Sequence, residues 1–136
     1  MAKKTDVGKL WSLNYRVVSS VIVSVAPDLA ELGLEVKELF VLAEVDVHPH
    51  PAELADVLCM PKPSVTVYIK RLEAAGFVRR EIDGADLRRH RIILTPEGRK
   101  TMARGLALLS NAFGARLARL TAAQQLELAT LLEKLS

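Results

Sequence analysis

Residues 51–94 read PAELADVLCMPKPSVTVYIKRLEAAGFVRREIDGADLRRHRIIL, and the pattern within them sets the architecture of the chain. At the centre, Lys62–Ala75 carries three apolar side chains at the i, i+4 and i+7 spacing of one helix face, namely Val65, Ile69 and Leu72. Lys62, Thr66 and Lys70 fall on the opposite face. One face would pack on a core while the other presents short polar and cationic groups. This layout is typical of a helix that enters a groove of DNA.

The neighbouring segments predict the rest of a helix-turn-helix and a wing. Upstream, Pro51–Leu58 is predicted to be a helix, because proline is well tolerated in the first helical turn. Gly76 stands where a residue in the left-handed conformation would end the second helix. Downstream, Phe77–Ile82 and His90–Leu94 are rich in branched side chains and predict two short strands joined by the charged loop 83–89. A helix-turn-helix followed by a charged hairpin is a winged helix.

Several pieces of this stretch occur together in one family of proteins. In chain order they are Glu53-Leu54-Ala55, Ser64-Val65-Thr66, Arg71-Leu72-Glu73 with Gly76, Arg80, the wing residues Asp83, Asp86 and Arg88, and Leu94-Thr95 with Gly98. This ordered set resembles the core of the MarR-type regulators, the multiple-antibiotic-resistance repressors. The rest of the chain resembles that family in layout only.

Two positions depart from the family pattern. Pro61 stands where the family usually has a small polar residue that caps the helix, and proline has no side-chain acceptor to offer. The first residue of the recognition helix is therefore left open. In the wing, Leu87 replaces the first arginine of the usual Asp-Arg-Arg, while Arg88 and Arg89 remain. We still expect a basic wing.

The resemblance implies a mainly α (α+β) fold, a winged helix-turn-helix with long N- and C-terminal dimerisation helices. Residues 1–136 would form a single domain, with residues 51–94 as the DNA-binding core and residues 7–46 and 96–136 as dimerisation helices. Two recognition helices of a two-fold homodimer would read half-sites about one turn of double-stranded DNA apart. The expected function is that of a transcriptional regulator, a repressor that binds a pseudo-palindromic operator.

The candidate DNA-contacting residues lie on the recognition helix and the wing. Candidates for base or backbone contact are Lys62, Pro63, Ser64, Thr66, Val67 and Lys70. Arg71 and either Arg79 or Arg80 are expected to meet phosphates, which position a protein without reading sequence. Arg88 resembles the wing-tip arginine of the family, which enters the minor groove, and Asp86 would orient it. Arg89 is a weaker candidate for DNA contact. The alternative is a solvated helix face with arginines that only form salt bridges to Glu81 and Asp83.

The charge distribution fits a directed electrostatic footprint. Residues 62–104 contain 11 Lys and Arg against 5 Asp and Glu, whereas residues 28–61 contain 1 against 8. The formal net charge of the whole chain is only +3. Positive charge is therefore gathered on the proposed motif, as expected for a nucleic-acid-binding surface.

The flanking segments predict further helices. Val7–Ala26 has a helical apolar stripe, although its β-branched second half leaves a buried strand as the alternative. Pro27 is predicted to interrupt it, with a turn or short helix at Asp28–Gly33 and a second helix at Glu35–Val45. Thr95 and Thr121 are predicted to cap two more helices, because a threonine oxygen accepts from the first turn. These helices offer more apolar surface than a small winged helix buries, which predicts a partner such as a second copy.

Three aromatic residues are candidates for an effector pocket. Trp11, Tyr15 and Phe40 would line a site at the dimer junction for a small aromatic or phenolic effector, as similar proteins use. The alternative is that they are simply core. Cys59 is expected to be a small buried thiol, with a redox role as the competing hypothesis.

Other classes of site and location are not favoured. Asp46, His48 and His50 have the residue types of a metal site but lack a fourth ligand, so neither metal nor cofactor is expected. No apolar run is long enough to span a membrane, and charged and polar residues within residues 1–27 argue against a secretory signal, so a cytoplasmic location is expected. The chain shows no nucleophile–base set and is not expected to be an enzyme. The alternatives to a regulator are a winged-helix protein-interaction module and a non-specific architectural DNA binder without effector response.

Overall fold

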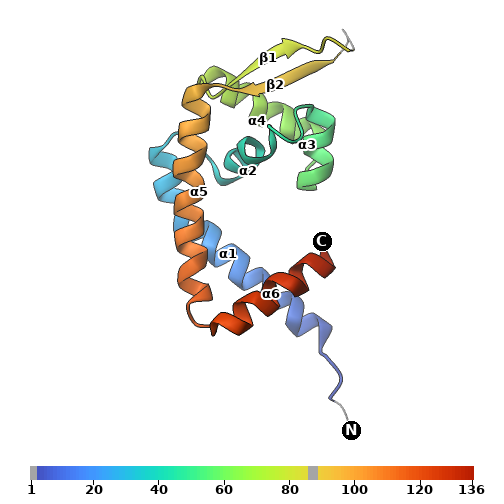
Figure 1. The fold of residues 1–136 in the computed structure, drawn as a ribbon, viewed down its shortest axis with the longest axis vertical. Coiled ribbons are helices and arrows are strands. Elements are labelled where there is room, and N and C mark those ends of the chain that lie inside the picture. Colours follow the sequence, from blue (N-terminus) through green and yellow to red (C-terminus); the bar gives the residue numbers. More distant parts are fainter. Residues whose placement is uncertain (1–2, 86–88) are drawn as a thin grey trace.

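The computed structural model describes residues 3–85 and 89–136, and it shows a helical chain with one two-stranded hairpin (Figure 1). In chain order the elements are α1 (Val7–Glu31), α2 (Val36–Glu44), α3 (Pro51–Leu58), α4 (Lys62–Ala74), β1 (Val78–Ile82), β2 (His90–Leu94), α5 (Pro96–Leu117) and α6 (Ala122–Leu135). This arrangement confirms the predicted α+β winged helix-turn-helix.

The winged-helix part is assembled around α4. Val65, Ile69 and Leu72 are each at most 1% exposed and belong to a single apolar core that also includes residues of α2, α3, β1 and β2. Helix α4 ends as predicted, because Gly76 has a φ of +80° and the N–H of Phe77 donates to the carbonyl of Leu72. The antiparallel hairpin that follows pairs Val78 with Leu94 and Ile82 with His90.

Helix α1 differs from the prediction at its C-terminal end. The prediction that Pro27 interrupts the helix is wrong, because α1 continues through it to Glu31, and the alternative of a buried strand is wrong as well. Val21, Val25 and Leu29 follow one another at helical spacing and are 5%, 3% and 0% exposed. Burying Leu29 on the core contributes roughly 1.5–3 kcal/mol, which offsets much of the cost of a proline inside a helix.

The predicted boundaries of α2, α3, α4 and the two strands differ by one residue or less. Helix α3 and strand β2 have the predicted limits, and β1 begins at Val78. Helix α2 is closed at its N-terminus by a reciprocal capping box, in which the Glu38 carboxylate accepts from the backbone N–H of Glu35 at 2.9 Å. Thr95 and Thr121 cap α5 and α6, which confirms both predictions.

The terminal helices extend away from the wing and leave much apolar surface uncovered. Helix α5 runs from the hairpin to the opposite end of the molecule, where α6 begins (Figure 1). Helix α6 has no buried residue. No single helix in the described parts of the chain is long and apolar enough to cross a membrane; α1 and α2 pass that test only as a pair, bent by 83° at the break between them.

Candidate DNA interface

Helix α4 presents one complete face to solvent while the other is buried. The exposed residues of the predicted interface on this helix are Lys62, Pro63, Thr66, Val67, Lys70 and Arg71, and Ser64 is half-buried. Val67 is 46% exposed, so an apolar methyl group stands among the cations and is free to meet a thymine methyl. The structure therefore brings these candidates together on one surface.

The N-terminal end of α4 has no side-chain cap. Pro61 is the N-cap residue and makes no side-chain hydrogen bond, as its lack of an acceptor predicts. Its carbonyl oxygen accepts from the backbone N–H groups of Ser64 and Val65. The Thr66 hydroxyl donates to the carbonyl of Lys62 at 3.0 Å, so its lone pairs are directed to accept hydrogen bonds from a partner.

The arginines of the predicted interface are held by carboxylates of the same chain. The pairs are Arg71 with Glu35 at 3.3 Å, Arg80 with Glu73 at 3.4 Å, Arg89 with Glu53 at 3.3 Å, and Arg79 with Glu81. The salt bridge of Arg79 to Glu81 agrees with the alternative interpretation for that residue. Lys62 and Lys70 have no ion-pair partner among residues 3–85 and 89–136. A neighbouring carboxylate thus partly neutralises each of these arginines but neither lysine.

Asp83 makes two hydrogen bonds at the base of the wing. Its backbone N–H donates to the carbonyl of Arg89 at 2.9 Å, and its carboxylate accepts from the N–H of Ala85 at 2.9 Å. The bond from Ala85 lowers the pKa of the Asp83 carboxyl below its ordinary value, helped by the charges of His50, Arg89 and Arg91 and opposed by desolvation. The predicted wing-tip residues Asp86 and Arg88 lie outside the described residues.

The three residues weighed as metal ligands have separate partners. Asp46 forms a two-pronged ion pair with Arg99, at 2.9 and 3.3 Å, and this hydrogen bond and charge raise the pKa of the guanidinium. His48 lies 3.9 Å from Glu44 and 3.8 Å from Glu53, whereas His50 contacts Asp83. Within the described part of the chain, no group of three or more His, Cys, Asp or Glu is placed to hold a metal.

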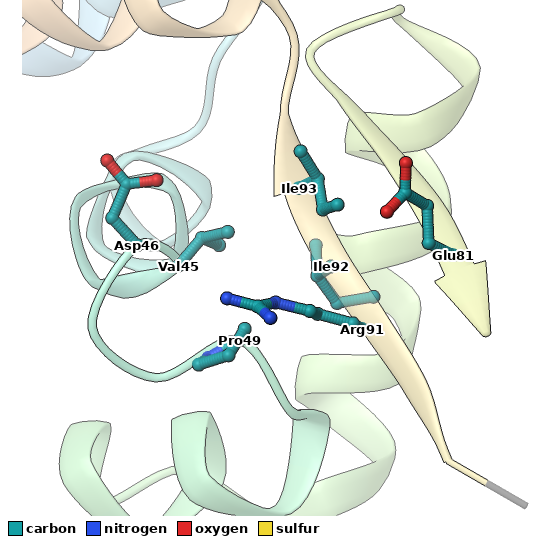
Figure 2. A pocket seen from close by; sticks show the side chains of 7 residues that line it. All are labelled: Val45, Asp46, Pro49, Glu81, Arg91, Ile92 and Ile93. Atoms are coloured by element: carbon teal, nitrogen blue, oxygen red, sulfur yellow. The ribbon is translucent and has the colours of Figure 1, made fainter. Parts of the chain in front are cut away.

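A hollow of about 160 Å³ separates the end of α2 and the α2–α3 linker from the wing strands (Figure 2). It is lined by Val45, Asp46, Pro49, Glu81, Arg91, Ile92 and Ile93. The Arg91 side chain extends between Pro49 and Ile92 toward α2 (Figure 2). Both carboxylates of this lining are already paired, Asp46 with Arg99 and Glu81 with Arg79.

In the described part of the chain, Tyr15 and Phe40 line different hollows. Trp11 and Tyr15 are 65% and 60% exposed, with ring centroids 6.3 Å apart. Tyr15 borders an open hollow of about 670 Å³ that also includes Arg16 and Arg116. Phe40 lines a different, wholly apolar hollow of about 250 Å³ between α1, α2 and α5. A pocket containing all three residues stays a prediction.

Cys59 is not the buried thiol that was expected. It is exposed and has a φ of +53° and a ψ of 41°, because it is the residue that ends α3 in the left-handed conformation. Its backbone N–H donates to the carbonyl of Asp56, and the next N–H, of Met60, donates to Ala55. The turn of the helix-turn-helix therefore directs this side chain outward, a consequence of backbone geometry that its apolar neighbours in sequence did not reveal.

Comparison with known proteins agrees with this arrangement. A family model described as "MarR family" matches residues 32–89. The HTH-type transcriptional repressor Rv2887 of Mycobacterium tuberculosis is 34% identical over 132 residues, which cover 96% of this chain and 95% of the relative. The crystal structure of that protein in complex with DNA has a TM-score of 0.76 at 34% identity and covers 93% of this chain and 97% of its own. Its complex with salicylic acid has a TM-score of 0.76 at 33% identity over 100% of both chains.

Proposed function

The chain belongs to the MarR family of regulators, and we propose that it acts as a homodimeric repressor that binds a pseudo-palindromic operator through α4 and the wing. One observation carries the proposal. Helix α4 is anchored by Val65, Ile69 and Leu72 on one face, while the opposite face leaves Lys62 and Lys70 exposed. A protein-interaction module would instead be expected to present an uncharged or apolar recognition face.

Within this proposal, the exposed residues of α4 have two roles. Ser64, Thr66 and Val67, in the first half of α4, would contact base edges. Lys62, Lys70 and the arginines Arg71, Arg80 and Arg89 would contact phosphates and set the position of the helix. Arg88 would enter the minor groove beside the operator half-site, with Asp86 orienting it.

A small aromatic acid is the effector class that we propose. The relative at 34% identity has been crystallised with salicylic and p-aminosalicylic acid. Here the hollow beside Phe40 would take an aromatic ring, and the hollow beside Tyr15 offers Arg16 and Arg116 for a carboxylate. Such a ligand would act by favouring a dimer whose two wings have a spacing unsuited to the operator.

The first test is selection from a random pool of genomic DNA fragments at two salt concentrations, followed by sequencing. We expect a palindromic motif and a steep loss of affinity with salt, since neutralised phosphates release counterions. Adding salicylate should lower the recovery of that motif. Uniform, salt-sensitive enrichment without a motif would instead support an architectural binder, and no enrichment at all would contradict the proposal.

A further inference from the structure

His50 connects the α2–α3 linker to the base of the wing through both nitrogens of its ring. Its Nε2 lies 3.3 Å from a carboxylate oxygen of Asp83, and its Nδ1 lies 3.3 Å from the backbone carbonyl oxygen of His90. The side chains of His50 and Asp83 are only 13% and 18% exposed. Among the described residues this is the ion pair with the least solvent exposure.

The two partners of the ring are both hydrogen-bond acceptors. A backbone carbonyl has no proton to donate, and Asp83 is ionised because its pKa is held below the ordinary range. With the single N–H of a neutral imidazole on Nδ1, facing the His90 carbonyl, Nε2 turns a lone pair toward the Asp83 carboxylate, whereas an imidazolium carries positive charge beside it. The contact between His50 and Asp83 is therefore an ion pair only when His50 is protonated.

The position of this contact in the hairpin is at the entrance to the wing loop. Asp83 directly follows β1, and His90 is the first residue of β2. Nearer the body of the molecule, the N–H of Ile92 donates to the carbonyl of Pro49 at 2.8 Å, and this bond joins the linker to β2 at any pH. Loss of the His50 proton would thus loosen the attachment of Asp83 and His90 to the linker while the winged-helix core stays assembled.

We propose that His50 is a positioning residue that, as an imidazolium, fixes the wing for DNA binding, so that affinity for the operator falls as pH rises. This inference rests on the proposed function and adds a regulatory input to it. The imidazolium is the form that makes both contacts, so the contribution is present at low pH. It is lost as pH rises and the ring releases its second proton.

The charged groups around this contact come from the linker, the wing, α2 and α3. They are His48 on the linker, Asp83, Arg89, His90 and Arg91 on the wing, Glu44 on α2 and Glu53 on α3. Arg89 is paired with Glu53, and His48 lies between Glu44 and Glu53 without a hydrogen bond to either among the described residues. Among the described residues His48 thus has carboxylate neighbours but no hydrogen bond or ion pair to the wing strands, which makes it a matched control.

The test compares operator affinity at pH 6 and pH 8 for the wild type and His50→Gln. Glutamine carries no titrating charge and can hold only one of the two contacts. We expect the wild type to bind roughly threefold to tenfold more weakly at pH 8, the range of one net hydrogen bond, and His50→Gln to be weak and nearly constant. His48→Gln and His90→Gln should keep the wild-type slope. An unchanged slope in His50→Gln would overturn the proposal.

A second readout does not depend on DNA. Ring ¹⁵N resonances of His50 in the free protein should show both nitrogens protonated at pH 6 and one at pH 8, with the Asp83 and Ala85 amide signals shifting over the same pH range. Asp83→Asn, which keeps an acceptor but removes the charge, should reduce this coupling. If no operator is bound at either pH, the proposed function fails while the resonances still test the contact. A ring that stays neutral at pH 6 would refute the role of His50.

Discussion

Gly98 and Gly114 lie on the same helix, α5, in very different surroundings. A Cβ atom added at Gly98 would lie 1.8 Å from the backbone oxygen of Phe77 and 2.7 Å from its carbonyl carbon. Backbone atoms cannot move aside as the end of a side chain can, so this glycine permits the start of α5 to pack directly on the residue before β1. At Gly114 an added Cβ would meet nothing within 4 Å.

At the scale of single residues we therefore predict opposite effects of the same substitution. Gly98→Ala should lower the free energy of unfolding by about 2 kcal/mol or more, because overpacking against a backbone forces the helix to shift. Gly114→Ala should raise it by up to about 1 kcal/mol, the difference in helix propensity. Urea unfolding followed by circular dichroism measures both. Similar unfolding midpoints for the two variants would contradict the packing argument.

At the scale of elements, helix α4 carries one cation with an ion-pair partner and others without such a partner among the described residues. Lys70 has no ion-pair partner among the described residues, whereas Arg71 is paired with Glu35, the residue just before α2. The negative charge of that carboxylate weakens a phosphate contact made by Arg71, while Lys70 has no such neighbour in an ion pair among the described residues. The arrangement implies that Lys70 contributes more to the electrostatic part of DNA binding than its position in the motif alone would indicate.

We predict that Lys70→Gln weakens binding to all sequences alike and reduces the slope of log affinity against log salt by about 1, since one phosphate contact is lost. Arg71→Gln should have a smaller effect on both quantities, and Glu35→Gln should strengthen binding by releasing Arg71. Fluorescence anisotropy at several salt concentrations gives the slopes. A larger loss for Arg71→Gln than for Lys70→Gln would show that the salt bridge does not compete.

At the scale of the whole molecule, α1 and α6 carry large apolar side chains that are exposed within one chain. On α6, Leu126, Leu131, Leu132 and Leu135 are 73%, 48%, 43% and 83% exposed. On α1, Val7, Leu10 and Trp11 are 74%, 58% and 65% exposed. Exposed apolar side chains of this kind mark an interface, and their presence on both terminal helices fits a second copy of the chain.

We predict that the protein sediments with about twice the mass of its 14.9 kDa chain. The double variant Leu131→Glu and Leu132→Glu should shift it to the monomer without loss of helix content, because α6 has no buried residue within one chain. Lys134→Glu, an exposed charge change on the same helix, should leave the dimer intact. A wild type that sediments as a monomer at micromolar concentration would refute the homodimer.

Much of the DNA-binding part could be predicted from the sequence, because the signals that define it are local. The i, i+4, i+7 spacing of Val65, Ile69 and Leu72 gave the orientation of α4, and Gly76 marked its end. Threonine caps and the branched residues of the hairpin act over a few positions of chain, so their outcome does not depend on distant contacts.

Tertiary structure alone decided the remaining features, because each depends on residues far apart in sequence. Helix α1 continues through Pro27 because burying Leu29 in the core stabilises the helix there. The sequence near Pro27 does not show that this burial occurs. The pairing of Arg71 with Glu35 and of Arg89 with Glu53 each spans 36 positions. The two acceptors around His50 likewise meet only when the hairpin folds back on the linker. Local periodicity determined which elements form, and packing between them determined which charges meet.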